Sequence, residues 1–239
     1  MRNRVWGIAV PMHPSQTFAE QYPAVTRDNQ WLAFTSNQTG RDEVYVRRLA
    51  GGGDQIQVSV GGGSEPVWSP DGRELFFRGV PNAATGTEAM IFAVKISTRP
   101  TLSVTSREAL FSASAIVTAN PHANYDVSPD GKRFVYVRSN PSSASFGDYR
   151  DLFWAADDRS LIALEYPESG FDTRLIRIPA NGGAPSYILR EGQATFWDHH
   201  PSPDGRYTLV PVEVAQGSTL WRVDLKAAEA AYKQRRRNH

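Results

Sequence analysis

The chain has 239 residues, of which 40% are hydrophobic, so it can bury a substantial core. Its 26 basic and 25 acidic side chains nearly cancel, which leaves no overall field to attract nucleic acid or an anionic membrane. Without cysteine it has no disulfides, thiolate nucleophiles or cysteine-ligated metal sites. The apolar runs are much shorter than the about 20 residues of a membrane helix. We therefore expect neither a nucleic-acid partner nor a membrane span.

The N-terminal segment contains Arg2 and Arg4, followed by a short strand-like run at residues 5–10. This apolar run is a poor secretory signal, so we identify no signal peptide in the chain. The absence of cysteine suits an extracytoplasmic protein and slightly favours a periplasmic or secreted location.

From residue 25 onward the chain repeats one turn motif. Three copies read Ser-Pro-Asp-Gly, at 69–72, 128–131 and 202–205, and two degraded copies occupy 26–29 and 155–158. Proline presets φ, Asp accepts local backbone hydrogen bonds, and Gly supplies a positive φ at the exit. Because a catalytic residue is not needed once per repeat, we interpret the recurring residues as structural turn residues: Asp28, Asp71, Gly72, Asp130, Gly131, Asp157, Asp204 and Gly205.

Strand-like runs follow each turn. The first runs are aromatic and aliphatic with little polar interruption, which is typical of strands buried on both faces: 31–34, 75–77, 134–137, 161–164 and 207–210. Second runs follow in most copies: 43–46, 90–94, 175–178 and 220–223. Glycine-rich turns at 51–53 and 181–183 then lead to a further strand. Each unit is therefore predicted to form one four-stranded antiparallel blade.

The turn aspartates are 43, 59, 27 and 47 residues apart, a mean of 44, and a propeller blade takes about 40–45 residues. The sequence thus predicts an all-β fold, a β-propeller of five to six four-stranded antiparallel blades. A unit of 27 residues is too short for four strands, so one blade can be incomplete, with an insertion after Asp71 and a shortened blade after Asp130. The last repeat has three strands, and a closing strand from residues 4–11 would complete it.

The predicted domain organisation follows from this closure. Residues 1–225 are expected to form a single propeller domain. Residues 226–239 are rich in alanine and then in arginine, which favours a short, basic C-terminal helical tail.

The motif at residues 65–77, Glu-Pro-Val-Trp-Ser-Pro-Asp-Gly-Arg-Glu-Leu-Phe-Phe, resembles the repeat of TolB-like propellers, also called WD-like Pro-Asp repeats. Residues 22–78 are similar in particular to the C-terminal propellers of some bacterial serine/threonine kinases and transcriptional regulators. The resemblance implies a non-catalytic scaffold for protein–protein interaction or ligand sensing, with a protein or peptide bound at one face of the disc. It also implies two alternatives: a metal-dependent propeller lyase or hydrolase acting on a carbohydrate, and the accessory propeller of a larger kinase or peptidase.

One polar cluster, Asp198-His199-His200, directly precedes the last turn. In a propeller this strand is innermost, so its side chains can approach the central channel. Two imidazoles and a carboxylate suit zinc or manganese, with Glu191 or Gln193 available to complete the shell. Against this, adjacent residues of a strand point to opposite faces, so His199 and His200 do not easily bind one metal ion.

The sequence also has no nucleophile elbow, no zinc-binding His-Glu-x-x-His and no phosphate-binding loop. We therefore predict no catalytic residues and no cofactor. Asp198, His199 and His200 are the predicted binding residues, with His199 and His200 as weak metal candidates.

Overall fold

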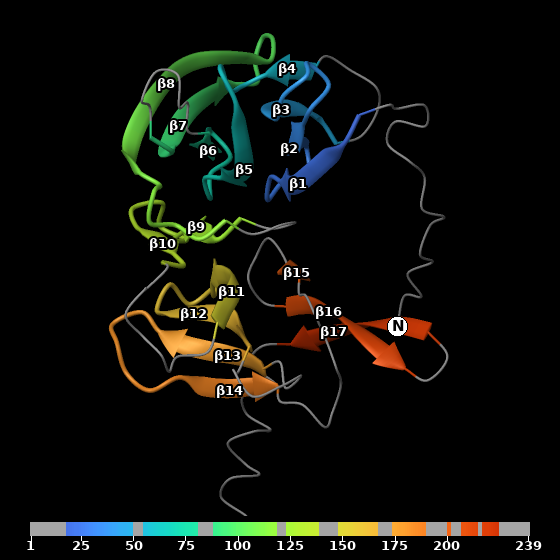
Figure 1. Ribbon diagram of the computed structural model, residues 1–239, viewed down its shortest axis with the longest axis vertical. Helices are drawn as coiled ribbons and strands as arrows, with labels where there is room; N and C mark the ends of the chain where they lie inside the picture. Colours follow the sequence, from blue (N-terminus) through green and yellow to red (C-terminus); the bar gives the residue numbers. More distant parts are fainter. Residues whose placement is uncertain are drawn as a thin grey trace, which may run out of the picture.

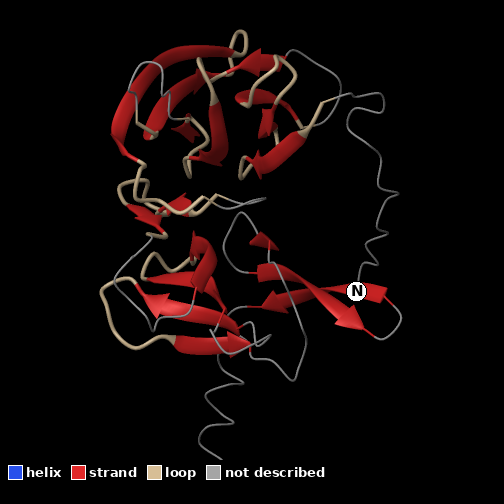
Figure 2. Ribbon diagram, in the orientation of Figure 1, coloured by secondary structure: helices blue, strands red, loops and turns tan. Residues whose placement is uncertain are grey.

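The computed structural model describes residues 18–49, 55–80, 88–118, 123–138, 148–166, 174–189, 200–201, 207–214 and 217–224. These residues form seventeen strands and no helix (Figure 2). This part of the chain therefore contains no helix able to cross a membrane.

The strands form five antiparallel sheets, each built from consecutive segments of the chain. The first sheet contains β1 (Glu20–Val25), β2 (Trp31–Ser36), β3 (Glu43–Arg48) and β4 (Gln55–Gln57). The second contains β5 (Gly63–Trp68), β6 (Glu74–Gly79), β7 (Met90–Ser97) and β8 (Ser103–Ser112). The third contains β9 (Tyr125–Val127) and β10 (Phe134–Tyr136). The fourth contains β11 (Asp148–Trp154), β12 (Ser160–Tyr166), β13 (Arg174–Pro179) and β14 (Ser186–Leu189). The fifth contains β15 (His200–Pro201), β16 (Tyr207–Val214) and β17 (Gly217–Asp224).

The five sheets follow one another around a common centre (Figure 1). The first strand of each sheet, β1, β5, β9, β11 or β15, lies on the inner side, and β4, β8 and β14 lie at the periphery. This radial arrangement of antiparallel sheets is that of a β-propeller.

Apolar side chains fill the spaces between neighbouring sheets. The first and second sheets share a core that includes Trp31, Val46, Trp68 and Leu75. A second core contains the buried side chains Phe76, Ala89, Ile91, Ala113, Ile116, Tyr125 and Val127, and joins the second sheet to the third. All six residues of β2 are buried, as expected of a strand covered on both faces. Burial of each Leu, Ile, Val or Phe side chain stabilises the fold by about 1.5–3 kcal/mol relative to leaving that side chain in water.

The turn after β5 shows how the repeated motif is held. The Ser69 hydroxyl donates to Asp71 Oδ1 at 2.7 Å and accepts the Glu74 backbone N–H at 2.9 Å. Asp71 Oδ1 also accepts the Arg73 N–H at 3.1 Å, and Gly72 has a φ of 70°. Thr26 and Ser128, with Asp28 and Asp130, make the same hydrogen bonds in the first and third sheets.

The fourth turn achieves a similar result with different residues. Ala155 has no hydroxyl, and the Ser160 hydroxyl lies 2.7 Å from Asp157 Oδ2 and 2.9 Å from Oδ1. Asp158 takes the position of the glycine with a φ of 55°. Asp157 therefore keeps its place in the turn although the motif around it has changed.

Successive turns lie beside each other. A Cβ added at Gly72 would lie 3.5 Å from Thr26 Cγ2, and one added at Gly131 would lie 3.9 Å from Pro70 Cδ. Arg133, after the third turn, pairs with Asp158 of the fourth at 2.6 Å. These turns define one side of the ring, which we call the turn face.

Hydrogen bonds also join the inner strands. Trp68 Nε1 on β5 donates to the Ala24 carbonyl on β1 at 3.1 Å. The Tyr125 hydroxyl on β9 donates to the Glu65 carbonyl on β5 at 2.6 Å. The inner strands of the first three sheets are thus connected in chain order.

The predicted all-β fold with four-stranded antiparallel sheets is confirmed. The first and second strand-like runs each fall within an observed strand to within one residue, whereas the ten-residue β8 was not predicted. After Asp130, where the spacing predicted a shortened unit, the third sheet has two strands among the described residues. The number of blades stays a prediction. The closing strand at 4–11, the helical tail at 226–239, Asp204 and Gly205 lie outside the described residues.

Candidate functional site

The predicted binding residues fall mostly outside the described part of the chain. Asp198 and His199 lie outside it, whereas His200 begins β15 and pairs with Leu209 on β16. Figure 1 places β15 on the inner side of the fifth sheet. The described residues contain no cluster of three or more His, Cys, Asp and Glu able to hold a metal ion.

A different candidate site lies where the inner strands β1 and β5 begin, on the side of the ring opposite the turn face. The pairing of β1 with β2 shifts between Gln21 and Ala24, and that of β5 with β6 shifts between Ser64 and Val67. We call this side the bulge face. Bulges re-aim side chains and are common beside functional sites.

Each bulge contains a non-glycine residue at positive φ. Tyr22 has a φ of 52° and Glu65 a φ of 57°. Such conformations are uncommon for bulky residues, and strained backbone clusters at functional sites. Tyr22 and Glu65 stand four positions before the hydroxyl residue of their turn, and Asn124 has this place in the third copy. The position therefore carries a different polar side chain in each of these sheets.

Glu65 is 1% exposed and forms an ion pair with Arg78 of β6, with 3.6 Å between Oε1 and Nη1. Arg78 Nη2 donates to the carbonyls of Ala113 and Ile116, at 3.2 and 3.1 Å. Arg78 thus connects the bulge of β5 with the segment that leads to β9. Its Nη1 is buried and, among the described residues, forms no hydrogen bond.

Burial raises the pKa of Glu65 to about 7, although the Arg78 charge and the Asn124 N–H favour the ionised form. Burial also raises the pKa of Tyr22, with further contributions from Glu65 and Asp42, while Arg78 lowers it. The cluster therefore combines a carboxyl group that titrates near neutrality, a guanidinium and a phenol. Titratable groups with strongly shifted pKa values are common at functional sites.

Two exposed valines lie on the bulge face. Val60, before β5, is 75% exposed, and Val80, after β6, is 38% exposed. A Cβ added at Gly62 would lie only 2.3 Å from Val80 Cγ2, so the backbone before β5 passes directly over Val80. We call Val60, Gly62 and Val80 the valine patch.

A substitution in the valine patch tests this close approach. Gly62 has a φ of 113°, and Gly62→Ala adds both backbone strain and a clash with Val80. We expect it to lower the free energy of unfolding by about 2–3 kcal/mol. The matched control is Gly61→Ala, because Gly61 has a φ of 84° but no atom within 4 Å of an added Cβ. It should cost about 1 kcal/mol. Equal losses in urea denaturation would show that the contact with Val80 is unimportant.

The sequence had pointed to Asp198, His199 and His200 and missed Glu65 and Arg78. Glu65 could have been found in the sequence, because the position four residues before the turn hydroxyl differs between the repeats, with Tyr22, Glu65 and Asn124 in the first three copies. No sequence pattern indicates Arg78, because its partners lie on β5 and in the segment before β9, far from it along the chain.

Comparison with known proteins bears on the fold. No family model matches the sequence, and no curated protein matches it. The crystal structure of TolB from Acinetobacter baumannii superposes with a TM-score of 0.64 at 19% identity, over 88% of this chain and 53% of that one. A protein assigned as TolB from Agrobacterium tumefaciens gives 0.58 at 17% identity, over 87% of this chain and 78% of that one. A prolyl endopeptidase structure superposes with a TM-score of 0.53 at 16% identity, over 88% of this chain and 34% of that one. This chain therefore spans about half the length of the A. baumannii protein.

Proposed function

The chain has the fold of the TolB-like propellers, and we propose that it is a non-catalytic module that binds a protein or peptide at its bulge face. The observation that carries this proposal is the valine patch. It presents Val60 and Val80 to solvent where the backbone at Gly62 packs closely against Val80. Exposed apolar side chains on a pre-formed backbone are suited to protein recognition, because little ordering is needed when a partner binds.

The polar surroundings of the patch support the same role. The Gly63 N–H donates to the Asp42 carbonyl at 2.9 Å, which ties the β2–β3 connection to the start of β5. Tyr22 lies on the inner strand of the neighbouring sheet, partly exposed. Tyrosine is enriched at interfaces because its ring packs and its hydroxyl forms hydrogen bonds. An apolar centre beside Tyr22 and the exposed Asp42 fits a peptide with apolar and basic side chains.

The position of Asp198, His199 and His200 within the last repeat extends the proposal to these three residues. In sequence, Asp198 stands four positions before Ser202, as Glu65 stands four positions before Ser69. We therefore propose that Asp198, His199 and His200 contribute to the same bulge face. The metal-dependent alternative depends on these three residues and stays a prediction, as does an accessory role in a larger kinase or peptidase.

Selection of random peptides from a display library on the immobilised protein tests the proposed face. We expect a selected peptide to lose at least about tenfold in affinity on Val60→Asp or Val80→Asp, equivalent to about 1.4 kcal/mol. The matched control is Leu110→Asp, because Leu110 is an apolar residue with nearly the same exposure as Val80, 37% against 38%, on the outer strand β8, and β7 lies between β8 and the end of β6 that leads to Val80. Equal affinities for the Val60 and Val80 variants and the wild type, or no selected peptide at all, would refute the proposal.

A further inference from the structure

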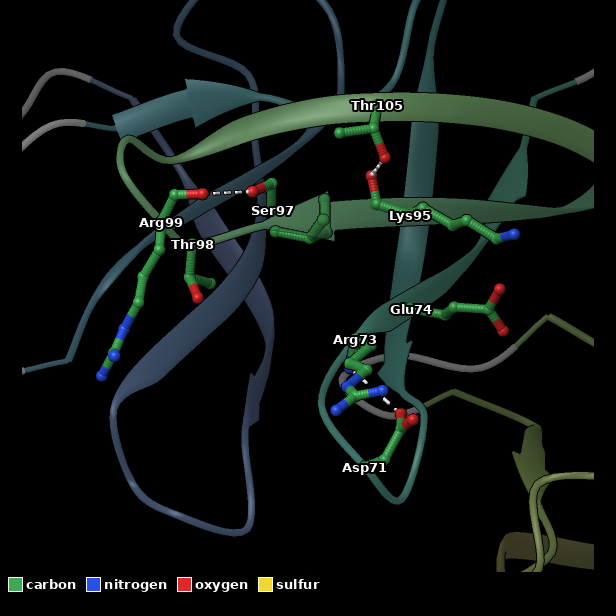
Figure 3. Close-up of a pocket in the computed structure, with 9 residues that line it drawn as sticks. Asp71, Arg73, Glu74, Lys95, Ser97, Thr98, Arg99 and Thr105 are labelled. Carbon is green, nitrogen blue, oxygen red and sulfur yellow. Dashed lines mark hydrogen bonds between the residues drawn. The ribbon is translucent and has the colours of Figure 1, made fainter.

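The turn face carries a separate groove of about 630 Å³ on the second sheet. It lies between the β5–β6 turn, with Asp71 and Arg73, and the end of β7 at Ser97 with the following connection at Arg99 (Figure 3). Its lining contains none of the residues of the valine patch, so it is distinct from the proposed binding face.

Three basic side chains line the groove: Arg73, Lys95 and Arg99. In Figure 3 Lys95 and Arg99 extend toward opposite sides of the groove. Both are exposed, and neither forms an ion pair with another residue in the described ranges. Two solvated cations are therefore held apart, Lys95 on β7 and Arg99 on the β7–β8 connection.

The two acidic residues of the lining are differently placed. Asp71 is committed to its turn, since it accepts hydrogen bonds from the Ser69 hydroxyl and the Arg73 N–H. Glu74 faces Lys95 in the register of β6 and β7. The lining is thus positive by one charge, with three basic against two acidic residues, but it is not uniformly basic. This mixture disfavours a densely charged polyanion and suits a ligand of moderate negative charge.

Two of the three hydroxyl groups in the groove lining are oriented by hydrogen bonds to backbone carbonyls. The Ser97 hydroxyl donates to the Arg99 carbonyl at 2.8 Å, and the Thr105 hydroxyl donates to the Lys95 carbonyl at 3.2 Å. Because both protons are engaged, the two oxygens remain able to accept hydrogen bonds. A peptide backbone supplies N–H donors of the required kind, whereas a phosphate or sulfate group does not.

We propose that this groove binds an acidic peptide segment of a partner protein. Carboxylates of the segment bind Lys95 and Arg99, and its backbone N–H groups donate to Ser97 and Thr105. The planar guanidinium of Arg99 can bind a carboxylate with two parallel hydrogen bonds.

Fluorescence anisotropy with a labelled peptide of repeated Glu-Ser units tests the proposal. We expect the wild-type protein to bind it, and the double variant Lys95→Gln/Arg99→Gln to weaken binding at least tenfold with an unchanged melting temperature. The matched control is Arg138→Gln/Arg159→Gln, which removes the same charge from two exposed positions of the third and fourth sheet regions, outside the groove lining. It should bind as the wild type does.

Several outcomes would overturn the proposal. Equal weakening by both double variants would show unspecific attraction, and an absence of binding to the wild type would remove the site. Displacement of the peptide by an oligonucleotide with higher affinity, dependent on Arg99, would assign the groove to nucleic acid instead. Val60→Asp should leave this binding unchanged, so the groove and the valine patch succeed or fail separately.

Discussion

Replacement of Arg78 by methionine is expected to lower the free energy of unfolding by about 3–5 kcal/mol at pH 7.5. The substitution keeps much of the side-chain volume but removes the ion-pair partner of Glu65, which is 1% exposed, so that the carboxyl group must either stay charged and unpaired or take up a proton. It also removes the two donors that bind the Ala113 and Ile116 carbonyls. Urea denaturation followed by tryptophan fluorescence measures the loss.

A double-mutant cycle separates the charge effect from the loss of packing. In a Glu65→Gln background no buried carboxylate remains, so Arg78→Met should cost less than in the wild type. The loss of free energy of unfolding caused by Arg78→Met alone should also be smaller at pH 5, where Glu65 is neutral. If Arg78→Met costs the same in both backgrounds and at both pH values, the ion pair does not stabilise the fold.

The second large effect is a dependence of stability on pH. Glu65 has a pKa of about 7 in the folded protein, whereas the ordinary value is 4.5. The folded state therefore holds the proton more tightly, and its stabilising contribution is present below pH 4.5 and is lost as the pH rises through 7. Over this range the group lowers the free energy of unfolding by about 3 kcal/mol, of which about 1 kcal/mol falls between pH 6 and 8.

The window above pH 6 isolates Glu65 from the other shifted carboxyl groups. Burial raises the pKa of Asp126 to about 6, against the opposing effect of the Trp154 and Val127 N–H groups, so most of its effect lies at lower pH. Hydrogen bonds from Ser69 and Ser128 lower the pKa values of Asp71 and Asp130, and these groups destabilise the fold only in acid. Glu65→Gln should reduce the change in the free energy of unfolding between pH 6 and 8 by about 1 kcal/mol. The same change in the variant and the wild type would contradict the assignment of the shifted pKa to Glu65.

The fold was largely predictable because its main determinant is local. A Ser-Pro-Asp-Gly turn is held by hydrogen bonds between residues at most five positions apart, as from Ser69 to Glu74, so each copy is visible in sequence. β8 escaped prediction because its residues are mostly exposed and polar, which hides the apolar pattern of a strand. Six consecutive residues of this outer strand are exposed, so it has neither a continuous apolar run nor a buried face that alternates with an exposed one.

The candidate site was less predictable because its contacts are long-range. Glu65, Arg78 and Ala113 meet although they are up to 48 positions apart, and no local pattern announces this contact. Val60 and Val80 are likewise ordinary in sequence, and only the folded backbone at Gly62 brings the connections before β5 and after β6 together. The turns are visible in the sequence because their residues repeat, whereas the candidate site consists of residues that differ from one repeat to the next.

Hydrogen exchange measured with and without a saturating selected peptide tests the central claim, that the bulge face binds a protein or peptide. The account predicts slower exchange in backbone amides around Val60 and Val80, and unchanged exchange in the turn at Ser69–Glu74. Protection confined to the turn face, or none on either face, would contradict it.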